Sequence, residues 1–202
     1  MITIGLTGQS GAGKGAFSKA LSLLGIPCLD TDITARQVVE KGKPCLLELV
    51  DSFGEAILLP DGCLDRKKLG TLAFSDKEKL LDLNCITHKY ISLEVDKWLK
   101  EQKDKGAFAA VIDAPQLFES GIDGICDMTV AILADENTRF LRILSRDGIT
   151  EEYAKKRMAS QKDDGFFISH CDHIIYNNGD EQELFEKAKA FVSEHLTNEE
   201  QK

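Results

Sequence analysis

The sequence predicts an α/β fold in which a largely parallel sheet is flanked by helices. Short apolar runs, which are typical of strands buried on both faces, alternate with amphipathic helical stretches along the chain. This alternation is the pattern of βαβ units, which bring successive strands together in parallel. A glycine-rich stretch directly after the first apolar run adds a tight connection from strand to helix. The expected strands are 1–7, 26–29, 108–113, 128–133 and 174–176.

The helices around these strands are predicted from apolar residues at helical spacing. The first helix is expected over 16–24, where Gly25 ends it. The last is expected over 181–196, with a frayed end at 198–202. Roughly 70 residues separate the second strand from the third. That is more than one connecting helix needs, so we expect an inserted helical subdomain able to hold a substrate.

These elements describe one domain over 1–202 with two insertions. A chain of this length buries a substantial core without needing a second independent domain. The core is expected at 1–32, 106–135 and 172–197, the helical substrate-binding subdomain at about 33–105, and a lid at about 139–165.

The composition excludes several classes of function. The formal net charge is −9, whereas general nucleic-acid binders carry a basic footprint, so no nucleic-acid partner is expected. No apolar run approaches the roughly 20 residues of a membrane span, and the first residues lack a signal-peptide pattern. The six cysteines are widely spaced, as reduced thiols often are. We therefore expect a cytoplasmic protein without membrane contact, and a monomer by default.

The strongest motif lies between the first strand and the first helix. It fits the first seven positions of the phosphate-binding pattern G-x-x-x-x-G-K-[ST], the P-loop. Glycines there let backbone N–H groups point at phosphate oxygens, and the lysine reaches the β- and γ-phosphates of a nucleotide. No N-K-x-D motif for reading guanine is present, which argues against a GTPase. We expect ATP to bind Gly8, Gln9, Ser10, Gly11, Ala12, Gly13, Lys14, Gly15 and Ala16, with Lys14 also catalytic.

Position 15 departs from this motif. It is glycine, where a serine or threonine hydroxyl usually coordinates Mg²⁺. Because Mg²⁺ commonly keeps several waters, it could be held by water, the phosphates and the carboxylates of Asp32 or Asp113, and Asp32 is our candidate metal ligand. Two functions are therefore possible for the glycine loop. The chain is either a kinase that transfers a phosphoryl group from ATP or a non-catalytic nucleotide-binding protein.

Two carboxylates, Asp30 and Asp32, follow the second predicted strand. Ligands of α/β sheets bind at the carboxyl ends of the strands. One of these carboxylates is therefore expected to take the proton from an attacking hydroxyl or to coordinate Mg²⁺. The alternative is that both cap the helix that begins near Thr34.

Further motifs cover nearly the whole chain in a characteristic order. They are Gly5-Leu6-Thr7-Gly8, Gly13-Lys14, Asp30-Thr31-Asp32, Ala35-Arg36-Gln37-Val38-Val39, Phe53-Gly54, Asp61-Gly62, Leu64-Asp65-Arg66, Ile86-Thr87-His88, Asp113-Ala114-Pro115-Gln116-Leu117-Phe118-Glu119, Asp172-His173-Ile174-Ile175 and Asn177-Asn178-Gly179. In these motifs the sequence resembles the dephospho-CoA kinases. Members of that family use ATP to phosphorylate the ribose 3′-hydroxyl of dephospho-CoA, the last step of coenzyme A biosynthesis.

The resemblance implies roles for particular residues. Asp32 would be the catalytic base or the carboxylate that orients the nucleophile. His88 would contact the substrate, although it is equally an ordinary, partly buried helix histidine. Residues expected on the CoA-type substrate are Asp32, Arg36, Arg66, His88, Pro115 and Leu117. Where the family has Ser, Leu and Pro, this chain has Gly15, Gln116 and Lys89.

A local excess of positive charge marks residues 139–162. This stretch has seven Lys and Arg residues against three acidic residues, a balance of +4. Arg139, Arg142 and Arg146 recur at spacings of three and four, so they can share one helix face. We expect Arg142 and Arg146 to close over ATP, with Arg142 also catalytic and Arg157 joining from the next helix. The alternative is a solvated amphipathic helix.

These expectations combine into one predicted reaction. The γ-phosphoryl group of ATP passes in line to a hydroxyl of dephospho-CoA, which Asp32 aligns. Another nucleoside or small-molecule kinase with the same core is the alternative, because a P-loop does not specify its acceptor.

Overall fold

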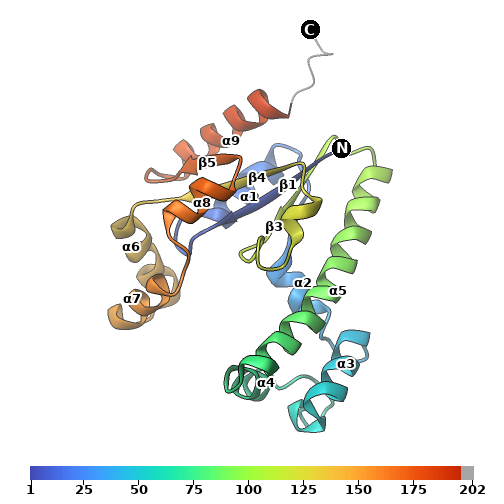
Figure 1. Cartoon of the computed structure of the whole chain (residues 1–202). Coiled ribbons are helices and arrows are strands. Elements are labelled where there is room, and N and C mark those ends of the chain that lie inside the picture. Colours follow the sequence, from blue (N-terminus) through green and yellow to red (C-terminus); the bar gives the residue numbers. More distant parts are fainter. Residues whose placement is uncertain (197–202) are drawn as a thin grey trace. The chain divides into compact units, whose positions relative to one another are not determined.

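The computed structural model describes residues 1–196 (Figure 1). The frayed end expected at 198–202, and residue 197 of the predicted core, lie outside these described residues. The chain divides into two compact units. The first is formed by residues 1–29 together with the chain from 99 onward, and the second by residues 30–98. Each unit is described in turn.

The first unit is organised by a five-stranded sheet, described here over residues 1–196. The strand order is β2-β3-β1-β4-β5, which places β1 at the centre. The pairings of β1 with β3, of β1 with β4 and of β4 with β5 are all parallel. The predicted α/β class with a parallel sheet is therefore confirmed. The strands are β1 (Ile2–Gly8), β2 (Cys28–Asp30), β3 (Ala109–Asp113), β4 (Met128–Leu133) and β5 (His173–Tyr176).

The register of the sheet brings the loops after several strands to one edge. Leu6 of β1 lies beside Asp113, the last residue of β3. Gly8, the last residue of β1, lies beside Ile132 near the end of β4. Parallel strands end at the same edge of a sheet, so the glycine loop after β1 and the Asp113 carboxylate at the end of β3 become neighbours.

Helices cover both faces of this sheet (Figure 1). Helices α1 (Lys14–Leu23) and α9 (Glu181–His195) share one apolar core with Val130 and Ile132 of β4. The alternate residues Ala131 and Leu133 face the other way, because successive side chains of a strand point to opposite faces. They pack against Phe167 of α8 (Asp164–His170). A sheet covered on both faces explains why its strands read as continuous apolar runs.

Two helices of the first unit occupy the stretch that the sequence predicts as a lid. They are α6 (Glu136–Asp147) and α7 (Glu151–Ala159). Gly148 ends α6 in a left-handed conformation with φ 60°, and Thr150 caps α7 by accepting a hydrogen bond from Tyr153 N. A short 3₁₀ helix, η2 (Ile122–Ile125), precedes β4. Whether α6 and α7 move as a lid stays a prediction.

The second unit is helical. Its helix α2 begins at Thr31, earlier than the start expected near Thr34, because Asp30 caps it. The Asp30 carboxylate accepts hydrogen bonds from Asp32 N at 2.8 Å and Ile33 N at 3.2 Å. A single antiparallel bridge joins Leu58 to Leu64. The helices that begin in this unit are α2 (Thr31–Gln37), α3 (Pro44–Phe53), η1 (Glu55–Ile57), α4 (Arg66–Phe74) and α5 (Lys77–Asp104), of which α5 continues into the first unit.

No helix within the described part of the chain is both long enough and apolar enough to cross a membrane.

The α1 helix offers a direct test of the predicted packing. Leu21 is fully buried in the core shared with α9, whereas Leu23, two residues on, is 70% exposed. We expect Leu21→Ala to lower the free energy of unfolding by about 2–5 kcal/mol, because it removes apolar contacts and leaves a cavity. Leu23→Ala is the matched control and should change it by less than about 0.5 kcal/mol. Denaturant unfolding measures both, and equal effects of the two substitutions would contradict the described core.

Candidate active site

The loop between β1 and α1 is shaped by three glycines with positive φ. The φ angles of Gly8, Gly11 and Gly13 are 146°, 80° and 98°, a region that other residues rarely adopt. Space is also lacking: a Cβ on Gly8 would lie 2.3 Å from Ile132 O, and one on Gly11 would lie 2.6 Å from Arg139 O. Glycine is therefore required at these positions both by conformation and by the close approach of neighbouring backbone.

The loop leads into α1 without a side-chain cap. Gly13 is the N-cap residue and, as a glycine, provides no side-chain cap for the helix. The first N–H groups of a helix carry a partial positive charge and are a favourable site for an anion. A phosphate group would satisfy the donors that a capping side chain satisfies elsewhere.

The lysine of the motif is directed by a carboxylate. Lys14 forms an ion pair with Asp113, the last residue of β3, and both side chains are largely buried. The sheet register places this carboxylate beside the glycine loop, at the edge where the strands end. Asp113, one of the two carboxylates considered for Mg²⁺, thus lies within the first unit and in contact with Lys14.

The segment after α7 is fastened to the glycine loop by a reciprocal pair of hydrogen bonds. Ser10 N donates to Gln161 Oε1 at 3.1 Å, and Gln9 Nε2 donates to Lys162 O at 3.0 Å. Two consecutive loop residues are thus joined to two consecutive residues about 150 positions away. Gln9 Oε1 is buried without a hydrogen-bond partner among the described residues. Gln161 had no assigned role from the sequence, because a single glutamine carries no recognisable motif.

Arg139 also binds Ser10 and Gln161, and its side chain is buried rather than on an exposed helix face. The sequence groups it with two other lid arginines on one helix face, but its side chain is 6% exposed. Its Nε donates to Ser10 O at 3.2 Å and its Nη2 donates to Gln161 Oε1 at 3.2 Å. Burial lowers the pKa of the Arg139 guanidinium, although the Asp164 and Glu136 carboxylates act in the opposite direction. Arg139 supports the loop backbone from within the protein.

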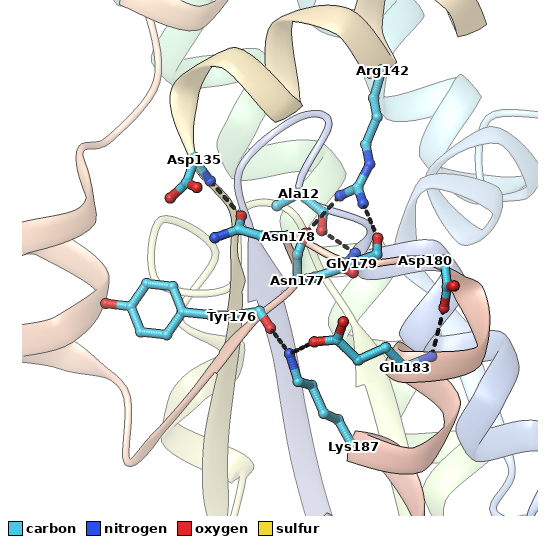
Figure 2. Close-up of polar contacts among 10 residues, drawn as sticks. All are labelled: Ala12, Asp135, Arg142, Tyr176, Asn177, Asn178, Gly179, Asp180, Glu183 and Lys187. Carbon is cyan, nitrogen blue, oxygen red and sulfur yellow. Dashed lines mark hydrogen bonds and ion pairs between the residues drawn. The ribbon is translucent and has the colours of Figure 1, made fainter.

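Arg142, predicted to be catalytic, lies in a network with the segment that follows β5 (Figure 2). Its Nη1 donates to Asn177 O and its Nη2 donates to Gly179 O, each at 2.8 Å. Asn177 in turn donates from Nδ2 to Ala12 O of the glycine loop at 2.7 Å. Both terminal nitrogens of Arg142 are therefore directed at backbone carbonyls, and its catalytic role stays a prediction.

Arg146 and Arg157 lie together around one carboxylate. Arg146 Nε lies 2.7 Å from Asp147 Oδ1, and Arg157 Nη1 lies 2.7 Å from Asp147 Oδ2. The hydrogen bond from Arg146, aided by the charges of both arginines, holds the pKa of Asp147 below its ordinary value. Arg146 Nη2 also lies 3.5 Å from Ser10 Oγ. Arg146 is thus an exposed arginine of α6 whose side chain contacts the glycine loop.

The second unit contains four of the predicted substrate and catalytic residues. Asp32 is exposed in the first turn of α2, where Asp30 rather than Asp32 accepts the capping hydrogen bonds. Arg66 Nη2 donates to Arg36 O at 3.2 Å, which brings these two arginines together. His88 is half-buried in α5. The predicted contact of Arg36, Arg66 and His88 with the substrate stays a prediction.

One departure from the family pattern has a visible structural role. Lys89 Nζ and Tyr90 Oη both donate to Glu48 Oε2, at 2.8 Å and 2.6 Å, and so tie α5 to α3. The hydrogen bond from Lys89 lowers the pKa of the Glu48 carboxyl.

Pro115 and Leu117, both predicted to contact the substrate, differ in their exposure to solvent. Pro115 is exposed just beyond the end of β3, so its predicted contact with substrate is available. Leu117 is 0% exposed, and its Cδ atoms lie about 3 Å from where a Cβ on Gly5 would be. The Leu117 side chain packs beneath β1 and belongs to the core, and its contact with a substrate stays a prediction.

The loop and its surroundings form an edge rich in donors and positive charge. Backbone N–H groups of a helix N-terminus, an ammonium group and a nearby arginine together suit a polyphosphate. In such a site catalysis proceeds by positioning and electrostatic stabilisation of the transferred group.

Comparison with known proteins agrees with this chemistry. The family model described as dephospho-CoA kinase matches residues 2–183. A dephospho-CoA kinase of Corynebacterium glutamicum is 39% identical over 197 residues, which cover 98% of both chains.

Solved structures of similar fold are also known. A Thermus thermophilus protein superposes with a TM-score of 0.82 and 28% identity over 98% of both chains. A dephospho-CoA kinase of Campylobacter jejuni shares the fold, with a TM-score of 0.72 and 23% identity over 96% of both chains. From the family match and the identity over almost its whole length, the chain belongs to the dephospho-CoA kinase family.

Proposed function

We propose that this chain transfers the γ-phosphoryl group of ATP to the ribose 3′-hydroxyl of dephospho-CoA, with the glycine loop as the ATP site. As a member of its family it is a phosphotransferase that converts dephospho-CoA to coenzyme A, with ATP as a substrate. The observation that carries the assignment of the site is the loop itself. Its three positive-φ glycines lead into an uncapped helix N-terminus that begins with Lys14.

The loop would act by holding the β- and γ-phosphates for in-line transfer. The Lys14 ammonium and the backbone N–H groups of residues 8–16, apart from those of Ser10 and Ala12 that donate within the protein, would neutralise charge on the phosphates. Lys14 contacts Asp113, so its ammonium group is already aimed at the edge of the sheet where ligands bind. Because phosphoryl-transfer transition states are loose, this positioning counts for more than the strength of any base.

Arg146 is the stronger candidate for a lid arginine. Its contact with Ser10 Oγ supports a place beside the phosphates. To reach them with its guanidinium it would exchange the Asp147 carboxylate for phosphate oxygens, an exchange between two anionic partners. Arg142 would have to give up two carbonyl hydrogen bonds to make the same contact.

Asp32 would align the acceptor hydroxyl and take its proton. Its exposure in the first turn of α2 supports this role, since Asp30 alone provides the cap. Arg36, Arg66 and His88 would bind the dephospho-CoA substrate, and Pro115 would join them. The hydrogen bond from the Arg66 guanidinium to the Arg36 backbone carbonyl supports a place for Arg66 beside this turn of α2, where its charge would attract an anionic group of the substrate.

A divalent cation is expected with ATP. The donors available suit Mg²⁺, because carboxylate oxygens such as those of Asp113 and Asp32 are hard ligands, whereas Gly15 supplies none. Those carboxylates would hold Mg²⁺ through water together with the phosphates. When bound, the ion neutralises charge on the phosphoryl oxygens. A cytoplasmic location and a monomeric state stay predictions from the sequence.

Coupled product analysis tests the function and the loop together. ADP should form only when dephospho-CoA is present, with one coenzyme A for each ADP. Lys14→Ala should weaken ATP binding and lower turnover together, by about a hundredfold or more in kcat/KM, since a charged contact to phosphate is lost. Lys19→Ala, on the exposed side of the same helix, is the matched control.

The other outcomes of this assay are equally informative. ATP binding without turnover on any acceptor would indicate the non-catalytic alternative. An unaltered Lys14→Ala enzyme would place the nucleotide site elsewhere.

Asp32→Asn separates alignment of the acceptor from nucleotide binding. Loss of the carboxylate should lower kcat by about 10²–10⁴-fold, because the hydroxyl loses its proton acceptor. The dissociation constant for ATP, measured by calorimetry, should change little. Asp51→Asn on an exposed face of α3 serves as the control. Turnover near the parent value would remove Asp32 from the mechanism.

Gly15→Ser restores the hydroxyl that the motif usually has. A Cβ at position 15 meets no atom within 4 Å, so a serine fits without strain. We expect the Mg²⁺ concentration for half-maximal activity to fall by about tenfold, because the serine hydroxyl adds one ligand to the ion. Gly124→Ser also adds a side chain in open space and is the control. An unchanged Mg²⁺ titration would show that the chain holds the ion without help from this position.

A further inference from the structure

Asn177 is a buried polar residue that the proposed reaction does not use. It follows β5 directly and its side chain is 5% exposed. Its Nδ2 donates to Ala12 O at 2.7 Å, a buried hydrogen bond that joins residues 165 positions apart (Figure 2). A buried amide is stabilising only when it is hydrogen-bonded, so this contact orders the side chain.

The atom that Asn177 holds determines the direction of a loop N–H. Ala12 O and the N–H of Gly13 belong to one peptide group, which is planar and trans, since no cis bond occurs among the described residues. In a trans peptide the carbonyl and the N–H point in opposite directions. Holding Ala12 O against Asn177 therefore turns the Gly13 N–H away from Asn177.

Packing at this position leaves the peptide little freedom. A Cβ on Gly13 would lie only 2.1 Å from Asn177 Nδ2. The Asn177 amide thus occupies the space that a side chain at position 13 would fill, and Gly13 keeps a φ of 98°. The amide and the glycine are fitted to each other.

Asn177 is itself held from two sides. Its backbone N donates to Leu133 O at 2.8 Å, which extends the pairing of β5 with β4. Its backbone O accepts from Arg142 Nη1, and Gly179 O accepts from Arg142 Nη2. The sheet and helix α6 therefore set the position from which the Asn177 amide reaches the loop.

We propose that Asn177 is a positioning residue of the nucleotide site, which presets the Gly13 peptide so that its N–H is directed at the polyphosphate of a nucleoside triphosphate. Arg142 supports this role by fixing the backbone on both sides of Asn178. The inference rests on the proposed placement of ATP at residues 8–16. A preset donor needs no reorganisation when the phosphate binds, which is the source of its contribution to affinity.

The neighbouring asparagine supplies a matched control. Asn178 Oδ1 accepts a hydrogen bond from Asp135 N at 2.8 Å, so this side chain uses its acceptor. Asn178→Asp keeps an acceptor, whereas Asn177→Asp replaces the donor to Ala12 O by an oxygen that repels it. The two substitutions introduce the same negative charge at adjacent positions in the sequence.

The test compares ATP dissociation constants by calorimetry, together with kcat and both KM values. Asn177→Asp should bind ATP about tenfold to a hundredfold more weakly than Asn178→Asp, as loss of a buried hydrogen bond implies. Asn177→Ala, which adds no charge, should raise the dissociation constant for ATP by about tenfold. In both Asn177 variants the KM for dephospho-CoA should stay near the Asn178→Asp value, whereas the melting temperature should fall because a buried hydrogen bond is lost.

Dependence on pH gives a signature that a merely structural role would not produce. Burial raises the pKa of the introduced carboxyl in Asn177→Asp, and its protonated form can again donate to Ala12 O. The ratio of ATP dissociation constants between Asn177→Asp and Asn178→Asp should therefore fall as the pH is lowered from about 8 to about 5.

The inference is overturned if Asn177→Asp binds ATP as tightly as Asn178→Asp. It is also overturned if Asn177→Ala weakens the binding of ATP and of dephospho-CoA by the same factor. Lys14→Ala distinguishes failure of the proposed Asn177 role from failure of the proposed ATP site. If Lys14→Ala weakens ATP binding and Asn177→Asp does not, only the role of Asn177 fails. If Lys14→Ala has no effect on ATP binding, the proposed ATP site fails as well.

Discussion

A phosphate-binding loop of the kind proposed here offers backbone N–H groups to its ligand, so contacts from the rest of the protein have to hold its shape. Here that shape requires positive φ at Gly8, Gly11 and Gly13 and leaves no room for a side chain at any of them. The supports are polar and come from distant segments. Asn177 holds Ala12 O, while Arg139 and Gln161 hold the carbonyl and the N–H of Ser10. The surrounding sheet and helices position these supports.

This arrangement changes how the arginines of α6 are understood. A helix with arginines at spacings of three and four suggests a shared face with one task, but the three side chains have different surroundings. Arg139 is buried against the loop, Arg142 binds carbonyls after β5, and Arg146 is exposed beside Asp147. The helix therefore contacts the loop backbone through Arg139, holds the segment after β5 through Arg142, and leaves Arg146 exposed. A charged helix face cannot be assigned one role from spacing alone.

The elements that can be predicted from the sequence are those set by residues close together in the chain. The strands were predicted because burial on both faces requires apolar runs, and β4 was predicted at the observed residues. The start of α2 was missed by three residues, because either Asp30 or Asp32 fits a cap and only the backbone shows that Asp30 accepts the hydrogen bonds. The burial of Leu117 could not be predicted, because an apolar residue in a family motif is equally suited to a substrate pocket and to the core.

By itself the sequence determined the α/β class, the glycine loop with Lys14, and the family. Each of these depends on residues adjacent in the chain: glycine for positive φ, lysine after the loop, and motifs in a characteristic order. Only the tertiary structure decided that Asn177 and Gln161 reach the loop from 165 and 151 residues away. The reason is that such contacts depend on strand order and register, which place the ends of β1, β4 and β5 at one edge, and no local spacing encodes them.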